Sequence, residues 1–139
     1  MGNWVQRTLQ NEIAREWMQS LTSQQDLRAV ADAFAKVPHD GAVCLQIAPA
    51  FTALAAAELV AALNGSPSQA LPANIVEWLK GKPKPTPQLR QRAIEVVKTI
   101  LNELENDDSE IKYLWEKSEE ELLYWTASVE ELRTRLTRT

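Results

Sequence analysis

The segment from Ala42 to Leu63 constrains the fold most, because it is apolar on nearly every side. Its large apolar residues trace no clean stripe on a helix, and small residues fill the positions between them: Ala53, Ala55, Ala56, Ala57, Ala61 and Ala62. A helix that is apolar all round is usually buried in the centre of a fold. Pro49 is expected in its first turn, since a proline further inside costs about 3 kcal/mol. Asn64-Gly65 suits the left-handed conformation that ends many helices.

Apolar residues elsewhere in the chain also repeat at helical spacing. Six further stretches place them three or four residues apart, which is the spacing of one face of a helix. The residues of these faces are Ile13, Trp17, Met18 and Leu21; Leu27, Val30, Ala31 and Phe34; Ile75, Trp78 and Leu79; Leu89, Ala93, Val96, Val97, Ile100, Leu101 and Leu104; Ile111, Leu114 and Trp115; and Leu122, Trp125, Val129, Leu132 and Leu136. No stretch indicates a strand.

Local signals mark where several of these helices begin. Thr86 is a suitable cap residue, and Pro87 after it fits a first helical turn. Ser118 and Glu121 form a capping box before the last helix. Residues 81–85 read Gly-Lys-Pro-Lys-Pro, which favours a stiff, exposed connector because prolines prefer extended geometry.

The composition is typical of one folded domain. Hydrophobic residues make up 45% and charged residues 24%, which argues against disorder. A single cysteine, Cys44, excludes an intramolecular disulfide. The longest apolar segment, Ala48 to Leu63, is shorter than the roughly 20 apolar residues that span a bilayer, and no secretory signal opens the chain. We therefore predict an all-α, cytoplasmic protein with no membrane contact: one domain over residues 1–139, with about seven helices around a buried Ala-rich central helix.

The net charge of −4 is unevenly distributed along the chain. Residues 71–100 have a net charge of +4, whereas residues 101–139 carry eleven acidic and five basic side chains. The basic cluster comprises Lys80, Lys82, Lys84, Arg90 and Arg92, and the acidic cluster comprises Glu103, Glu105, Asp107, Asp108, Glu110, Glu116, Glu119, Glu120 and Glu121. The overall acidity argues against nucleic-acid binding. The acidic cluster is either a solvated surface with favourable charge at helix N-termini or a docking surface for a basic protein.

The residues that carry catalytic chemistry are few. His39 is the single histidine, so the three or four ligands that a zinc site needs have no matching pattern, and no metal or cofactor is predicted. Cys44 lies in an apolar run, where the pKa of a thiol rises and its reactivity falls. Glu58 lies within the Ala-rich segment, where we expect it to reach the protein edge or pair with an arginine rather than act in catalysis. We predict no enzymatic activity.

Tryptophan is frequent for a chain of this size. Four of the five tryptophans fall at core positions of the expected helices: Trp17, Trp78, Trp115 and Trp125. Trp4 precedes any expected helix. Trp4 either packs into the bundle and holds the N-terminal segment on it, or is an exposed anchor residue that contacts a partner.

Several stretches match a known family in their order. They are Gly2-Asn3-Trp4; Leu9-Gln10-Asn11-Glu12 with Ala14 and Trp17; residues 55–65, AAAELVAALNG; Leu71-Pro72 through Trp78-Leu79; and Ser109-Glu110, Leu114-Trp115-Glu116, Trp125, residues 127–133, ASVEELR, and Leu136. This order resembles domain-of-unknown-function family 4259, a bacterial family of small helical proteins. The resemblance implies a helical fold and a bacterial source, and the family label carries no activity.

Small size, an acidic C-terminal third and the lack of a catalytic constellation favour a non-enzymatic binding protein. We expect an immunity or antitoxin-type protein that neutralises a basic toxin domain. Its predicted partner-binding residues are Glu103, Glu105, Asp107, Asp108, Glu110, Glu116, Glu119 and Glu120. The alternative is a structural or regulatory helical domain that self-associates, for instance as a homodimer, through an apolar helix face. A third hypothesis is an enzyme that uses Cys44, His39 and Glu58.

Overall fold

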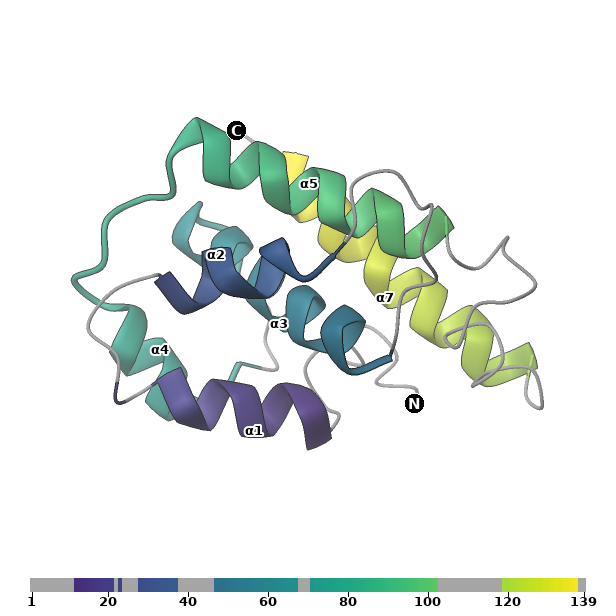
Figure 1. Ribbon diagram of the computed structural model, residues 1–139, viewed down its shortest axis with the longest axis horizontal. Coiled ribbons are helices and arrows are strands. Elements are labelled where there is room, and N and C mark those ends of the chain that lie inside the picture. The colour runs from purple at the N-terminus through teal and green to yellow at the C-terminus, as the bar shows by residue number, and fades with distance from the viewer. Residues whose placement is uncertain are drawn as a thin grey trace.

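The computed structural model of the protein describes residues 12–21, 23, 28–37, 47–67, 71–102 and 119–137. Within these ranges the chain forms six helices and no strand, as predicted for an all-α fold (Figure 1). The helices are α1 (Glu12–Leu21), α2 (Arg28–Ala35), α3 (Ile47–Leu63), α4 (Ala73–Leu79), α5 (Pro87–Asn102) and α7 (Glu119–Thr137). The further expected helix with Ile111, Leu114 and Trp115 lies outside the described residues, as do Trp4, His39 and Cys44.

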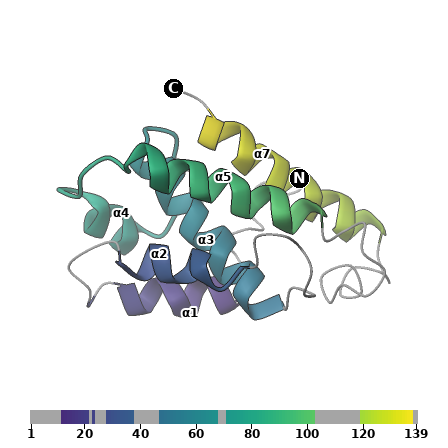
Figure 2. The ribbon, with the colours of Figure 1, turned by 45° about the horizontal axis from the view of Figure 1, so that its top comes forward.

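Helix α3 occupies the centre of the bundle. It packs against α1, α2, α5 and α7, and Figure 2 shows α5 and α7 on one side of it, with α1 and α2 on the other. Every residue from Ala53 to Ala61 is buried. Alanines let neighbouring helices approach α3 closely from several directions, which explains why a segment without an amphipathic stripe forms the core. The predicted buried, Ala-rich central helix is confirmed.

Both predicted ends of α3 are also confirmed. Pro49 is the third residue of the helix and therefore lies in its first turn. At the other end Gly65 adopts φ +96°. The Gly65 N–H donates to the Ala62 carbonyl at 3.1 Å, and the Ser66 N–H donates to the Ala61 carbonyl at 2.9 Å. This pair of bonds is the Schellman motif, which satisfies carbonyls that the last helical turn leaves free.

The close packing around α3 gives a first prediction. Replacing Ala56, which is fully buried, with leucine is expected to lower the free energy of unfolding by about 1–3 kcal/mol, because the added carbons displace packed neighbours. Ala48 lies on the exposed side of the first turn of the same helix, so Ala48→Leu is the matched control and is expected to change stability by less than about 0.5 kcal/mol. Urea unfolding followed by circular dichroism measures both. Equal effects of the two variants would show that α3 is not tightly enclosed.

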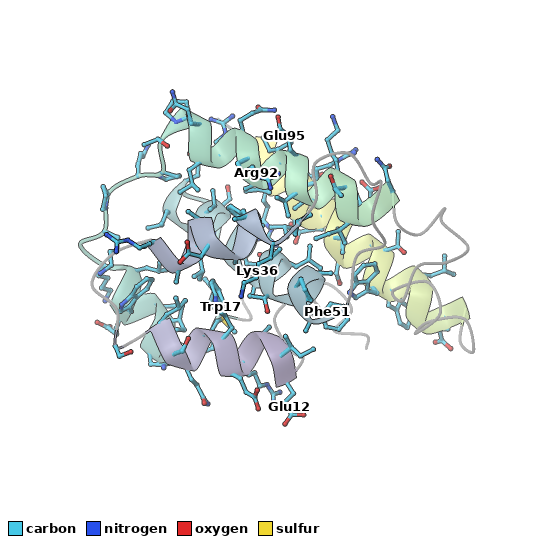
Figure 3. The ribbon with its side chains drawn as sticks, viewed as in Figure 1. Glu12, Trp17, Lys36, Phe51, Arg92 and Glu95 are labelled. Carbon is cyan, nitrogen blue, oxygen red and sulfur yellow. The ribbon has the colours of Figure 1, made fainter. Side chains whose placement is uncertain are left out.

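The apolar faces of α1 and α2 pack against α3. The predicted face of α2 was wrong at one residue. In α2, Val30 and Phe34 are buried as predicted, but Ala31 is exposed and Ala33 is buried in its place. Successive residues of a helix lie about 100° apart, so Ala31 turns away from the face that Val30, Ala33 and Phe34 share. In α1, Met18 and Leu21 are buried and Trp17 is half-buried against the core (Figure 3).

Helices α5 and α7 complete the bundle with the predicted faces. The buried residues of these faces are Ala93, Val96, Val97 and Ile100 in α5, and Trp125, Val129, Leu132 and Leu136 in α7. Leu104, Ser118 and the side chains of Glu121 and Leu122 lie outside the described residues, so the predicted capping box of the last helix stays a prediction. None of the described helices has both the length and the hydropathy needed to cross a bilayer.

The N-terminus of α5 has the predicted cap. The Leu89 N–H donates to the Thr86 Oγ1 at 3.1 Å, and Pro87 is the first helical residue. Thr86→Ala is expected to lower the free energy of unfolding by about 1 kcal/mol, because it leaves a helical N–H without its acceptor. Thr86→Ser keeps the hydroxyl and is the control. Thermal unfolding of the two variants checks this, and an alanine variant as stable as the serine variant would contradict it.

Candidate functional site

A buried ion pair joins the middle of α3 to the end of α7. Glu58 is the one charged residue in the α3 sequence, and its side chain is 0% exposed. Its Oε1 lies 2.7 Å from Nη2 of Arg135, whose side chain is 6% exposed. The expectation that Glu58 pairs with an arginine is confirmed. Although the contact departs from the angles of a good hydrogen bond, the 2.7 Å separation places the two charges in direct contact.

The remaining nitrogens of Arg135 also have partners. Nε donates to Oε2 of Glu131 at 2.6 Å, one turn earlier in α7, and Nη1 donates to the carbonyl of Ser66 at 3.2 Å. Burial alone would lower the pKa of Arg135, but the charge of the adjacent Glu58 carboxylate and the hydrogen bond to Glu131 outweigh it and raise this pKa above its usual value. We call Glu58, Glu131, Arg135 and the Ser66 carbonyl the Arg135 cluster.

The geometry of the Arg135 cluster indicates a structural role. The guanidinium contacts both carboxylates, so Glu58 is held in an ion pair with a permanent positive charge. The cluster instead connects α3, the turn after α3 and α7 at one point. In the hypothesis of an enzyme that uses His39, Cys44 and Glu58, the Glu58 carboxylate would have to act while it is paired with Arg135. His39 and Cys44 lie outside the described residues.

Two arginines of the basic cluster donate hydrogen bonds to backbone carbonyls at or just after helix ends. Arg90 Nε donates to the carbonyl of Leu136, in the last turn of α7, at 3.0 Å. Arg92 Nη2 donates to the carbonyl of Phe34, in the last turn of α2, at 2.8 Å, and to that of Val37, just after α2, at 3.1 Å. Positive charge is favourable at a helix C-terminus, where carbonyls lack partners. Sequence reasoning missed both contacts.

The lysines of the basic cluster lie around α4 and the connector after it. Lys80 Nζ is 2.9 Å from Oε1 of Glu77, and both side chains are largely exposed. Lys82 Nζ lies 4.5 Å from the ring centroid of Trp78, a cation–π contact. Lys84 is exposed. Exposed pairs such as Lys80–Glu77 contribute between about 0 and 1 kcal/mol, so Lys80 and the exposed Lys84 stay available for contacts with other molecules.

The predicted acidic surface is described in small part. Glu120 is exposed on α7, and its Oε1 accepts a hydrogen bond from the Tyr124 hydroxyl at 2.8 Å. Glu119 begins α7. The Glu119 side chain and the other predicted residues lie outside the described residues: Glu103, Glu105, Asp107, Asp108, Glu110 and Glu116.

Sequence reasoning missed an apolar residue on the same surface. Leu123 is 68% exposed and lies three residues after Glu120, on the outer face of α7 that also carries exposed Glu130. The signal was present in the sequence, because Leu123 falls outside the Trp125–Val129–Leu132–Leu136 face. We call Glu120, Leu123 and Glu130 the outer face of α7.

In the part of the chain that the structure describes, no three His, Cys, Asp or Glu side chains are grouped so that they could hold a metal ion. The comparisons with curated proteins and with solved structures gave no match. One family model matches residues 2–128, which include five of the six described helices and the first part of the sixth. The chain therefore belongs to the family described as Domain of unknown function (DUF4259).

Proposed function

We propose that this protein is a non-enzymatic binding protein of the bacterial cytoplasm, of the immunity or antitoxin type, that neutralises a toxin with a basic surface. The observation that carries the proposal is the outer face of α7, where Leu123 is 68% exposed beside exposed Glu120. Negative charge speeds encounter with a basic partner and disfavours acidic ones. An apolar side chain within that charge supplies a contact that excludes water on binding.

The buried contacts that hold α7 against the core favour the same binding role. The inner face of the helix is fixed by buried Trp125 and by the Arg135 cluster. A binding face on a rigid element loses little conformational entropy when a partner docks. The net charge of −6 over residues 101–139 extends the acidity beyond the described part of α7.

The experiment is a rescue assay in bacteria. The product of each gene adjacent to the gene for this protein is expressed from an inducible promoter, alone and together with this protein, and growth is measured. We expect one product to arrest growth and this protein to restore it. Glu120→Lys is expected to weaken rescue and the affinity of the purified pair by at least tenfold, since the opposite charge repels a basic partner. Glu16→Lys makes the same charge change at an exposed position of α1 and is expected to rescue fully.

Three outcomes would contradict the proposal. The first is that no neighbouring gene product is toxic, and the second is that none binds this protein. The third is that Glu16→Lys and Glu120→Lys weaken rescue equally. The last result would mean that overall charge, and not the outer face of α7, governs binding.

A further inference from the structure

The described surface carries two exposed large apolar side chains: Leu123 beside acidic residues, and Val76 beside the exposed Glu77–Lys80 pair and the lysines that follow it. Leu123 on α7 is 68% exposed and follows three consecutive glutamates, residues 119–121. Val76 on α4 is 41% exposed and precedes Lys80, Lys82 and Lys84. Helix α4 and the beginning of α7 lie at opposite ends of the molecule in both views (Figures 1 and 2). The two patches therefore cannot meet within one chain.

The spacing of the two patches is complementary. On α7, Glu120, Leu123 and Ala127 stand at positions i, i+3 and i+7 of one face, and Leu123 and Glu120 are exposed. Exposed Ala73 and Val76 lie on α4, and exposed Lys80 is the residue that caps its C-terminus, so the three have the same sequence spacing: i, i+3 and i+7. Seven residues of a helix span about 10 Å, so the patch on α7 and the patch formed by α4 and its cap residue have similar lengths.

Antiparallel placement of the two helices brings unlike charges and apolar groups together. Glu120 then lies opposite Lys80, Leu123 opposite Val76, and the small Ala127 opposite the small Ala73. The exposed Lys80–Glu77 pair does not prevent this, because such pairs contribute between about 0 and 1 kcal/mol and rearrange readily.

We propose that the outer face of α7 in one copy of this protein docks antiparallel on α4 of a second copy. The contact joins different patches of the two copies, so each dimer still has one free face of each kind, and association continues into larger chains or closes into a ring. The contact is small and partly electrostatic, so association is weak and salt-dependent. It requires no toxin, and it would compete with any partner that binds the outer face of α7.

The test is light scattering on the purified full chain over a concentration series. We expect the average mass to rise with concentration at low salt and to fall towards the monomer at about 0.5 M salt, where the Debye length is only a few ångströms. Glu120→Lys and Lys80→Glu are each expected to lower the association constant at least tenfold, because each places like charges opposite one another. Glu16→Lys is expected to leave it unchanged.

A mixing experiment separates this docking mode from other effects of the substitutions. An equimolar mixture of the Glu120→Lys and Lys80→Glu proteins is expected to recover association, because each protein then meets an unlike charge on the other. The double variant is expected to associate with itself as the unsubstituted chain does. A monomer at every concentration up to about 1 mM overturns the proposal, as does association that is insensitive to both substitutions. Neither result bears on the rescue assay.

Discussion

Arg135→Met is expected to lower the free energy of unfolding by about 3–5 kcal/mol, because it leaves the charge of Glu58 buried without its partner. The Glu58 side chain is 0% exposed and sits in the middle of α3, where alanines surround it. Water cannot replace the guanidinium there without opening the bundle. The same substitution frees the Ser66 carbonyl, whose bond with Arg135 Nη1 joins α7 to the turn after α3.

The control lies two residues away on the same helix. Arg133 pairs with Glu130 at 3.4 Å, but both side chains are about half exposed, so Arg133→Met is expected to change stability by less than about 1 kcal/mol. The double variant Glu58→Met/Arg135→Met removes both buried charges and is expected to recover most of the stability lost in Arg135→Met. Chemical denaturation measures all three. If Arg135→Met and Arg133→Met have equal effects, the Arg135 cluster does not stabilise the fold.

The direction of the Arg135 pKa shift sets its pH behaviour. A group whose pKa is higher in the folded protein stabilises the fold fully below its unfolded pKa, and this contribution is lost only as the pH rises through the folded pKa. The pKa of a free arginine already lies far above neutral pH, and the folded protein raises the pKa of Arg135 further. Titration of Arg135 therefore removes no stability between pH 5 and pH 9, and the Arg135→Met effect should not shrink through deprotonation of the arginine in that window.

The central helix could be predicted from sequence because local features determine it. Its burial followed from apolar residues on every side, and both ends followed from the conformations that Pro49 and Gly65 favour. The pairing of Glu58 was predictable as a class, since a buried carboxylate needs a cation. Its partner Arg135 was not, because 77 residues separate the two in the chain and only the packing of α7 on α3 joins them.

Contacts between side chains and distant backbone atoms were beyond sequence reasoning. Arg90 and Arg92 look like a surface charge cluster with Lys80, Lys82 and Lys84. Only the tertiary fold places their guanidinium groups at the ends of α7 and α2. The misplacement of Ala31 has a more local cause. Alanine is small enough for either side of a helix, so hydrophobicity alone does not assign its face.

The acidic surface shows that the sequence also predicts a candidate binding site only in part. Charge density singled out Glu120, which the structure shows to be exposed; its role in binding stays a prediction. It did not single out Leu123, because a sequence shows the apolar face of a helix more clearly than an isolated apolar residue opposite it. The sequence does not show that Val76 on α4 and Leu123 on α7 are both exposed and lie at opposite ends of the bundle. Only the structure gives their exposure and their positions, on which the proposed docking depends.

Trp125→Ala is expected to lower the free energy of unfolding by about 3–5 kcal/mol, because it leaves a large cavity between α7 and α3. The Trp125 side chain is 1% exposed and is among the largest fully buried side chains of the described residues. Its ring centroid lies 6.2 Å from that of Phe51 on α3, with the ring planes tilted by 41°. Trp125→Phe keeps an aromatic contact with Phe51 and is expected to fall between the alanine variant and the unsubstituted protein.

Leu123→Ala is the matched control for Trp125→Ala, two residues away on the same helix. Two residues turn a helix by about 200°, so Leu123 points away from the core, and its loss is expected to change stability by less than about 0.5 kcal/mol. Thermal unfolding by circular dichroism measures both variants. Light scattering should show the opposite pattern to unfolding: Leu123→Ala, which has little effect on stability, is expected to weaken association while the protein remains folded. If Leu123→Ala destabilises the fold as much as Trp125→Ala does, α7 has no free outer face, and both proposed interactions of that face fail together.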